Sequence, residues 1–287
     1  MADAPARTWP ALDVDVRHGS VLPGDFDDRL ALALDDLAPV AIEDRPGVHW
    51  RVYFENESAR DAAVAPLEHA FRELVELTPV NVPDEGWAVK VQQTLGAVNV
   101  GRFVVAPPWD VPAVPASAPD TVVLVIEPSM GFGTGHHQST RLCLRWLQQQ
   151  DVADARVIDA GTGSGVLAIA AARLGAREVL AVDNDPDAVA AAADNVARNG
   201  VTGVVTCRVD DLDTIEAAPA RIVLANLTAF LLRRYAHRLA PLVAEGGVLV
   251  AGGFTIDQVP LVLDALPGMR VRGREDEDDW VGLVLSR

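Results

Sequence analysis

The chain has 287 residues, of which 49% are hydrophobic, and its formal net charge is −17. This length and composition allow two domains of ~100–200 residues, and such a negative charge repels phosphate backbones, which disfavours direct binding to nucleic acid. No apolar run approaches the ~18–20 residues that span a bilayer, and no signal-peptide pattern opens the chain, so we expect a cytoplasmic protein without membrane contact.

Residues 1–82 show the pattern of a small α+β domain. Residues 12–16 alternate apolar and acidic side chains, as a half-buried strand does, and apolar residues from Phe26 to Leu37 fall at helical spacing. Strands over residues 40–42 and 48–54, a second helix over about 57–74 and a strand over 74–80 follow. The order β-α-β-β-α-β is typical of a ferredoxin-like unit.

The rest of the chain divides at about residue 120. Residues 83–120 are rich in Pro and Gly and predict a linker that contains a strand over residues 98–105. From residue 121 to residue 287, apolar strands alternate with helices, which is typical of a mostly parallel sheet covered on both faces. The predicted strands are 122–126, 157–159, 179–182, 204–209, 222–225, 247–251 and 280–285, and the predicted helices are 139–149, 166–174, 186–199 and 230–242.

A glycine-rich turn with the sequence Asp-Ala-Gly-Thr-Gly-Ser-Gly occupies residues 159–165, between a strand and a helix. The glycines at 161, 163 and 165 let the backbone approach a ligand and expose the amides of the helix N-terminus. A dinucleotide fingerprint needs its third glycine one residue later, where this chain has Val166. The spacing therefore favours a nucleoside without a pyrophosphate over a nicotinamide dinucleotide, and a tight turn without a ligand is the alternative.

A second candidate lies at the end of the next strand, where Asp183 follows Val182. Ligands of open α/β sheets bind at the carboxyl ends of the strands, and a ribose-binding acid follows the glycine turn by roughly twenty residues. Asp183 is therefore predicted to accept hydrogen bonds from both ribose hydroxyls. The alternative role, capping the helix that begins at Pro186, suits Asp185 better.

Residues 127–140, Glu-Pro-Ser-Met-Gly-Phe-Gly-Thr-Gly-His-His-Gln-Ser-Thr, resemble a signature of the PrmA-type methyltransferases, Asp-Pro-Gly-x-Ala-Phe-Gly-Thr-Gly-x-His-x-Thr-Thr. These enzymes methylate the eleventh protein of the large ribosomal subunit. The resemblance extends to the glycine turn, Asp183, the Ala-Asn-Leu sequence at 225–227 and the closing strand from Asp279 to Leu283. The chain departs from the signature at residues 127, 129 and 131, and His136 and Gln138 stand where Thr and Pro are typical of the family. Its first domain matches the family in layout more than in residues.

The resemblance implies a class I S-adenosylmethionine-dependent methyltransferase, with a Rossmann-like, mostly parallel sheet and a small N-terminal ferredoxin-like domain that recognises a protein substrate. The substrate implied is a ribosomal protein, methylated at lysine or other amino groups. The residues implied to bind the cofactor S-adenosylmethionine are Phe132, Thr134, His137, Thr140, Asp159, Gly161, Gly163, Gly165, Asp183 and Asn226.

Asn226 is also the candidate catalytic residue. Methyl transfer needs a neutral amine held in line with the methyl group, so positioning supplies much of the rate acceleration. In amino-group methyltransferases that this chain resembles, an Asn in this place accepts a hydrogen bond from the substrate amine, whereas the structural alternative is an Asn that ends a strand. His137 either contacts the cofactor, helps to remove a proton, or joins the loop to the helix by a hydrogen bond.

Several alternatives stay open or are disfavoured. No metal is expected, because His136 and His137 lack companion ligands at suitable spacing and the two cysteines, Cys143 and Cys207, are far apart in the sequence. The acidic run at residues 275–279 is interpreted as a solvated hairpin tip. The acceptor could be another protein or a small amine, a non-catalytic cofactor-binding module would not need Asn226, and a nicotinamide dehydrogenase conflicts with the glycine spacing.

Overall fold

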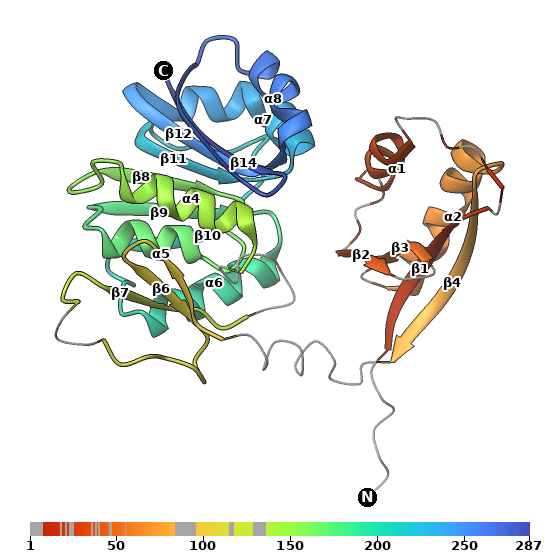
Figure 1. Cartoon of the computed structure of the whole chain (residues 1–287), viewed down its shortest axis with the longest axis horizontal. Coiled ribbons are helices and arrows are strands. Elements are labelled where there is room, and N and C mark those ends of the chain that lie inside the picture. Colours follow the sequence, from red (N-terminus) through yellow and green to blue (C-terminus); the bar gives the residue numbers. More distant parts are fainter. Residues whose placement is uncertain are drawn as a thin grey trace, which may run out of the picture. The chain divides into compact units, whose positions relative to one another are not determined.

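The computed structural model describes residues 8–17, 19–20, 22, 26–35, 37, 39, 41–45, 48–54, 56–83, 96–114, 118–128 and 136–287. The chain divides into two compact units, Met1–Lys90 and Val91–Arg287 (Figure 1). The domain limits expected from the sequence, after residues 82 and 120, remain predictions. Each unit has its own hydrophobic core and is described by itself below.

The first unit has the predicted order β-α-β-β-α-β. Its four strands form one antiparallel sheet in the order β2-β3-β1-β4. The core side chains Leu12, Val14, Leu30, Val52 and Leu67 are fully buried between this sheet and the two helices. The elements are β1 (Thr8–Val16), α1 (Phe26–Asp35), β2 (Ala41–Arg45), β3 (Val48–Tyr53), α2 (Glu57–Phe71) and β4 (Val75–Pro83).

The second unit is built on a seven-stranded sheet in the order β10-β9-β8-β11-β12-β14-β13. The five strands from β10 to β12 are parallel to one another, β14 runs antiparallel to β12, and the edge strand β13 pairs antiparallel with β14. This confirms the mostly parallel sheet. The strands are β8 (Arg156–Ala160), β9 (Glu178–Asp183), β10 (Val205–Val209), β11 (Ala220–Asn226), β12 (Val243–Thr255), β13 (Arg270–Glu277) and β14 (Trp280–Ser286).

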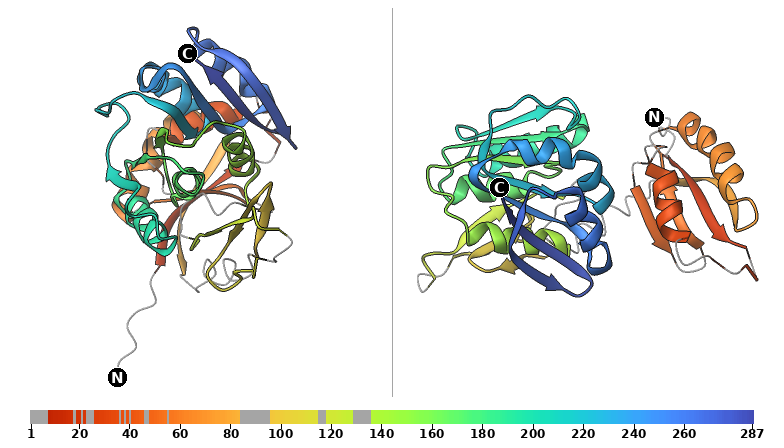
Figure 2. Two further views of the ribbon diagram at one scale, coloured as in Figure 1. Left: turned by 90° about the vertical axis from the view of Figure 1, so that its left-hand side faces the viewer. Right: turned by 90° about the horizontal axis from the view of Figure 1, so that it is seen from above.

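Helices cover both faces of this sheet (Figures 1 and 2). Successive strand residues point to opposite faces, so Val157 belongs to the core under α4, α5 and α6, whereas Ile158 belongs to the core under α7 and α8. The same alternation holds in β9 and β11. The helices are α4 (Gln138–Gln148), α5 (Val166–Arg173), α6 (Pro186–Arg198), α7 (Ala229–Leu242) and α8 (Val259–Ala265).

Three short strands form a separate sheet beside α5 (Figure 1). They are β5 (Val98–Val100), β6 (Phe103–Ala106) and β7 (Val122–Val125), and β7 pairs parallel to β6 rather than joining the large sheet. The prediction of one strand over residues 98–105 is wrong, because the chain turns back at Gly101, whose φ is 61°. Glycine adopts this left-handed conformation without steric cost.

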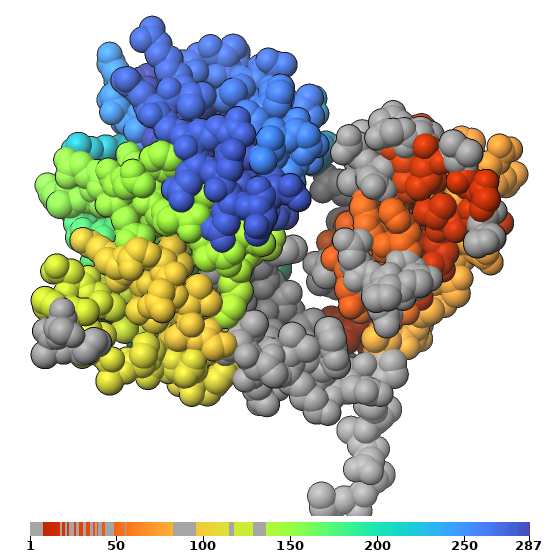
Figure 3. Space-filling view, viewed as in Figure 1, coloured from red at the N-terminus to blue at the C-terminus, as the bar shows by residue number. Residues whose placement is uncertain are grey.

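The last part of the chain also differs from the sequence prediction. β13 and α8 were not predicted, and the acidic run at 275–279 is only partly a turn, because its first three residues belong to β13. Figure 3 shows the C-terminal residues, in dark blue, next to the green surface of α4. Within the described residues, no helix is both long and apolar enough to cross a membrane.

Candidate cofactor and amine site

The candidate site lies where three strands of the large sheet end. Asp159, Asp183 and Asn226 stand at the carboxyl ends of β8, β9 and β11. Because successive strand residues point to opposite faces of the sheet, all three side chains point to the face covered by α4, α5 and α6. The chain leaves β8 for β9 on one side, while β11 pairs on the other, so the site lies at the topological switch point where ligands of such sheets bind.

The glycine turn has the backbone that the sequence predicts. Gly161, Gly163 and Gly165 have φ angles of 72°, 51° and 81°, which side chains other than glycine rarely tolerate. A Cβ on Gly161 would lie 2.4 Å from Cδ2 of Leu227, the residue after Asn226. The turn and the end of β11 are therefore in direct contact, and only glycine fits between them.

Asp159 lies fully buried beneath this turn. Its Oδ2 accepts hydrogen bonds from Thr162 Oγ1 at 2.7 Å and from the Ala168 amide at 3.1 Å. Burial raises the pKa of the Asp159 carboxyl to about 6 in spite of these two bonds. Its Oδ1 is buried and has no hydrogen-bond partner among the residues that the structure describes. A buried oxygen without a hydrogen-bond partner destabilises the folded protein unless a bound ligand supplies the missing donor.

Asp183 is held next to the same turn. Its Oδ2 accepts a hydrogen bond from the Gly163 amide at 2.9 Å, and its Oδ1 accepts one from the Asp185 amide at 3.2 Å. Each carboxylate oxygen can still accept a further bond, because an ionised carboxylate offers about four acceptor positions. Asp185 caps α6 by accepting from the Asp187 amide, as the sequence predicts. Asp183 is therefore free for another role.

The side-chain amide of Asn226 has a hydrogen-bond partner at its nitrogen but, among the described residues, none at its oxygen. Its Nδ2 donates to Thr140 Oγ1 at 3.2 Å, in the first turn of α4. Its Oδ1 is buried and lacks a partner within the described part of the chain. A Cβ on Gly252 would approach this oxygen to 3.2 Å and Cys143 Sγ to 2.6 Å, so the glycine leaves room for the amide.

His137 caps the N-terminus of α4, which begins at Gln138. Its Nδ1 accepts from the Ser139 amide, and its ring packs edge-on against Trp280, with centroids 4.3 Å apart. Burial, and after it the Arg141 guanidinium, lowers the pKa of His137 below its usual value. This shift favours the neutral imidazole, and the hydrogen bond from the Ser139 amide gives His137 the structural role among the expected alternatives.

The structure brings most of the predicted residues together, and it reveals others. Phe132 and Thr134 lie outside the described residues. The sequence reasoning missed Thr162, whose hydroxyl binds Asp159, and Asn195, a buried polar residue on α6. The available signal was the position of Asn195 in an Ala-rich helix. An Asn that such a helix buries needs hydrogen-bond partners for its amide, and these partners lie elsewhere in the chain.

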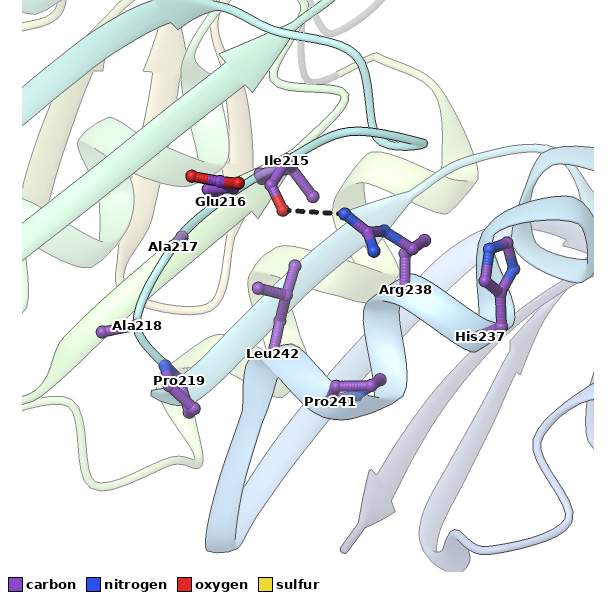
Figure 4. Close-up of a pocket in the computed structure, with 9 residues that line it drawn as sticks. All are labelled: Ile215, Glu216, Ala217, Ala218, Pro219, His237, Arg238, Pro241 and Leu242. Carbon is purple, nitrogen blue, oxygen red and sulfur yellow. Dashed lines mark hydrogen bonds between the residues drawn. The ribbon is translucent and has the colours of Figure 1, made fainter.

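A surface hollow lies away from this site. Its volume is about 690 Å³, and it opens between the loop before β11 and the last turns of α7 (Figure 4). Arg238 donates to the Ile215 carbonyl across it at 3.1 Å. The loop of residues 215–219 leads into the amino end of β11, whereas the candidate site lies at the carboxyl end of that strand. No group of three or more potential metal ligands occurs in the described ranges.

The buried free oxygens of Asp159 and Asn226, the carboxylate of Asp183 and the glycine cradle fit a ligand with a ribose and a cationic aminoacyl part. S-adenosylmethionine has these groups. A site that fits this cofactor, on a sheet with this strand order, defines a class I methyltransferase. The chain belongs to the ribosomal protein L11 methyltransferase (PrmA) family, whose model matches residues 35–287. Its methyl donor is S-adenosylmethionine.

Relatives support this assignment. The ribosomal protein L11 methyltransferase of Deinococcus radiodurans is 37% identical over 253 residues, which cover 86% of this chain and 88% of that protein. The enzyme of the same name from Heliobacterium modesticaldum is 36% identical and covers 88% of this chain and 83% of its own. A solved ribosomal protein L11 methylase from Lactobacillus delbrueckii subsp. bulgaricus superposes with a TM-score of 0.61 at 28% identity, covering 67% of this chain and 99% of that one.

Proposed function

We propose that this chain transfers methyl groups from S-adenosylmethionine to amino groups of ribosomal protein L11, with lysine side chains among the acceptors. The substrate is inferred from the relatives, because two proteins named as L11 methyltransferases are 37% and 36% identical to this chain over most of its length. Such a substrate is made in the cytoplasm, where we place the reaction. Direct contact with nucleic acid stays disfavoured by the net charge of −17.

The observation that carries the proposal is the free Oδ1 of Asn226. This oxygen is buried, has no partner among the described residues, and belongs to a residue whose neighbour Leu227 contacts the glycine turn. An amine nitrogen has hydrogens to donate, and the fixed amide oxygen is an acceptor that would orient it. Because Thr140 holds the other end of the amide, the acceptor is preorganised before the substrate binds.

The chemistry needs position more than reactive side chains. The bound cofactor supplies an electrophilic methyl group on a sulfonium. The lone pair of the amine forms the new N–C bond, the C–S bond breaks with its electron pair staying on sulfur, and the substituted ammonium later loses its proton to water. Asn226 would hold the nitrogen on the line of attack, which is the main source of acceleration in such a reaction.

The remaining site residues are proposed cofactor contacts. Asp183 would accept from the ribose hydroxyls, and Asp159 Oδ1 would face the cationic end of the cofactor. The glycine turn leaves no Cβ in the way. His137 and Thr140 would act through the position of α4 and of Asn226, while Phe132 and Thr134 remain predictions from the resemblance.

The test is methyl transfer from labelled cofactor to purified L11 and, in parallel, to ribosomes that lack this modification. Label on L11, located at lysine residues or the N-terminus by mass spectrometry, is the expected result. Free lysine and a mixture of other basic proteins are offered as competing acceptors. Faster labelling of one of these than of L11 would transfer the proposal to the alternative acceptor, and cofactor binding without any transfer would leave only a binding module.

A further inference from the structure

Two asparagines one turn apart, Asn195 on α6 and Asn199 at the C-terminal cap of this helix, reach across to the chain that leads into residues 127–140. Asn199 Oδ1 accepts from the Val125 amide at 2.9 Å, and its Nδ2 donates to the Val125 carbonyl at 2.7 Å. Asn195 Oδ1 accepts from the Glu127 amide at 2.9 Å. The two side chains thus bind the backbone of β7 and the residues after it much as a neighbouring strand would.

Asn195 has a second connection that Asn199 lacks. Its Nδ2 donates to the carbonyl oxygen of Ser164, in the glycine turn, at 3.0 Å. Asn195 is 1% exposed and Ser164 is also 1% exposed, so water does not compete for this bond. A single side chain therefore holds both segments to which cofactor residues are assigned.

Neighbouring residues on α6 support the same arrangement. Arg198 donates to Asn195 Oδ1 at 2.9 Å and pairs with the Glu127 carboxylate. One turn earlier, Ala192 packs so closely on the glycine turn that a Cβ on Gly165 would lie 3.2 Å from its Cβ. The helix is thus in contact with the turn through Ala192 and Asn195, and with residue 127 through Asn195 and Arg198.

We propose that Asn195 is a positioning residue for the cofactor site, and that it sets the spacing between the glycine turn and the segment that begins at Glu127. This inference rests on the assignment of the cofactor to that site. A ligand held by two separate loops binds more tightly when the loops are already in place, because less conformational freedom is lost on binding. The buried amide supplies this order through three backbone groups at once, because its Nδ2 also donates to the Glu127 carbonyl at 3.4 Å.

The loss of Asn195 leaves the Glu127 amide and the Ser164 carbonyl without their partner. Asn195→Ala should weaken S-adenosylmethionine binding by about tenfold or more, as measured by calorimetry below the melting temperature of the variant. Asn199→Ala is the matched control, because it removes the same atoms one turn away but does not touch the glycine turn. Its affinity should stay within about twofold of the unchanged protein, although both variants lose thermal stability.

Hydrogen exchange of the full chain without cofactor gives an independent readout. In Asn195→Ala, peptides over residues 161–165 and 125–127 should both exchange faster, whereas in Asn199→Ala the increase should be confined to residues 125–127. Asn195→Asp keeps the acceptor for the Glu127 amide and removes the donor to the carbonyls of Ser164 and Glu127, so at neutral pH its faster exchange should be greatest in the turn. It also replaces Asn195→Ala if that variant does not fold.

The inference fails if Asn199→Ala weakens cofactor binding as much as Asn195→Ala, or if exchange in the glycine turn is unchanged in both Asn195 variants. Failure of the proposed function looks different. In that case the unchanged protein binds S-adenosylmethionine without methylating L11, while the two asparagine variants still differ in affinity and in exchange.

Discussion

Asp159 places a titratable oxygen inside the candidate site, and its pKa of about 6 makes it sensitive to pH. A cation nearby favours the carboxylate, so a cofactor with a sulfonium and an ammonium binds the ionised form better. The affinity for S-adenosylmethionine should therefore fall as the pH drops from 7 to 5, with most of the change below about 6. Isothermal calorimetry across this range measures it.

Asp159→Asn is the matched variant, because it keeps the shape and removes the titration. Its affinity should be lower at pH 7 and nearly constant down to pH 5. The stability of the fold changes with pH in the opposite direction. Because the pKa of Asp159 in the folded protein exceeds its value of 3.8 in the unfolded chain, the free energy of unfolding falls as the pH rises from there towards about 6. A wild-type affinity as flat as that of Asp159→Asn would remove Asp159 from the cofactor site.

Asp183 tests the ribose assignment. Asp183→Ala should weaken S-adenosylmethionine binding by roughly 10- to 150-fold, because charge-assisted hydrogen bonds contribute ~1.5–3 kcal/mol. The neighbouring variant Asp185→Ala is the control, since Asp185 caps α6 and makes no bond to the glycine turn. It should lower the melting temperature with little change in affinity. If Asp183→Ala folds and binds the cofactor normally, the ribose lies elsewhere.

Asn226 tests the chemistry itself. Truncation to Ala removes the proposed acceptor for the reacting nitrogen, so single-turnover methyl transfer should slow ~100-fold or more with a smaller change in cofactor affinity. Asn226→Asp should not rescue the rate fully at neutral pH, because a carboxylate favours the charged ammonium and depletes the nucleophilic free amine. Its rate should recover as the pH rises. Equal rates in all three proteins would make Asn226 a structural residue only.

At the level of elements, an ion-pair network joins α4 to the C-terminal hairpin. Glu277 on β13 pairs with Arg141 and Arg145, and Glu275 pairs with Arg145 at 2.5 Å. Burial raises the pKa of Glu277, but the hydrogen bonds from Arg141 and Arg145 outweigh it, and the net pKa is lowered. The hairpin thereby holds Trp280 against His137, the residue that caps α4.

Glu277→Gln should destabilise the second unit by ~1.5–3 kcal/mol at pH 7, the range for hydrogen bonds to a charged partner. Since the folded pKa is below the ordinary value of 4.5, this stabilisation is present above pH 4.5 and lost as the pH falls further. Thermal melts at pH 7 and at pH 4 measure the difference in stability between the wild-type protein and Glu277→Gln, and this difference should be smaller at pH 4. Asp276→Asn, on the exposed side of β13, is the control and should change little.

The elements also show what could be predicted from the sequence. The strands of the large sheet were predictable because both their faces are buried, which makes their sequences continuously apolar. The glycine turn was predictable because its three positive φ angles require glycine. β13 was not, since an edge strand made mostly of Arg, Glu and Asp has no apolar side to reveal it, and its pairing depends on β14 and α4. The link from Asn195 to Ser164 joins residues 31 apart and required the folded chain.

At the scale of the whole molecule, acidic residues outnumber Lys and Arg by 41 to 24. We expect the long-range negative field of this chain to attract a protein substrate with a basic surface and to repel nucleic acid. The excess of negative charge therefore suits an enzyme that takes a basic protein as substrate, and ionic strength would weaken the encounter.

The last prediction concerns the division of the chain into two units. Val91–Arg287 contains both cores of the large sheet and every candidate site residue, whereas Met1–Lys90 has a core of its own. A chain without residues 1–90 should therefore bind S-adenosylmethionine with nearly unchanged affinity. Its kcat/KM for L11 should fall ~100-fold or more, because a second binding module raises the effective concentration of the substrate at the site.

The isolated first unit provides the control for this deletion. Residues 1–90 added in excess should inhibit methylation of L11 by the full chain and leave its cofactor affinity unchanged, because they would compete only for the protein substrate. The decisive comparison is the initial rate of L11 methylation by the full and the shortened chain at equal occupancy by cofactor. If the shortened chain works at the full rate, L11 is recognised by the second unit, and the ferredoxin-like unit has another role.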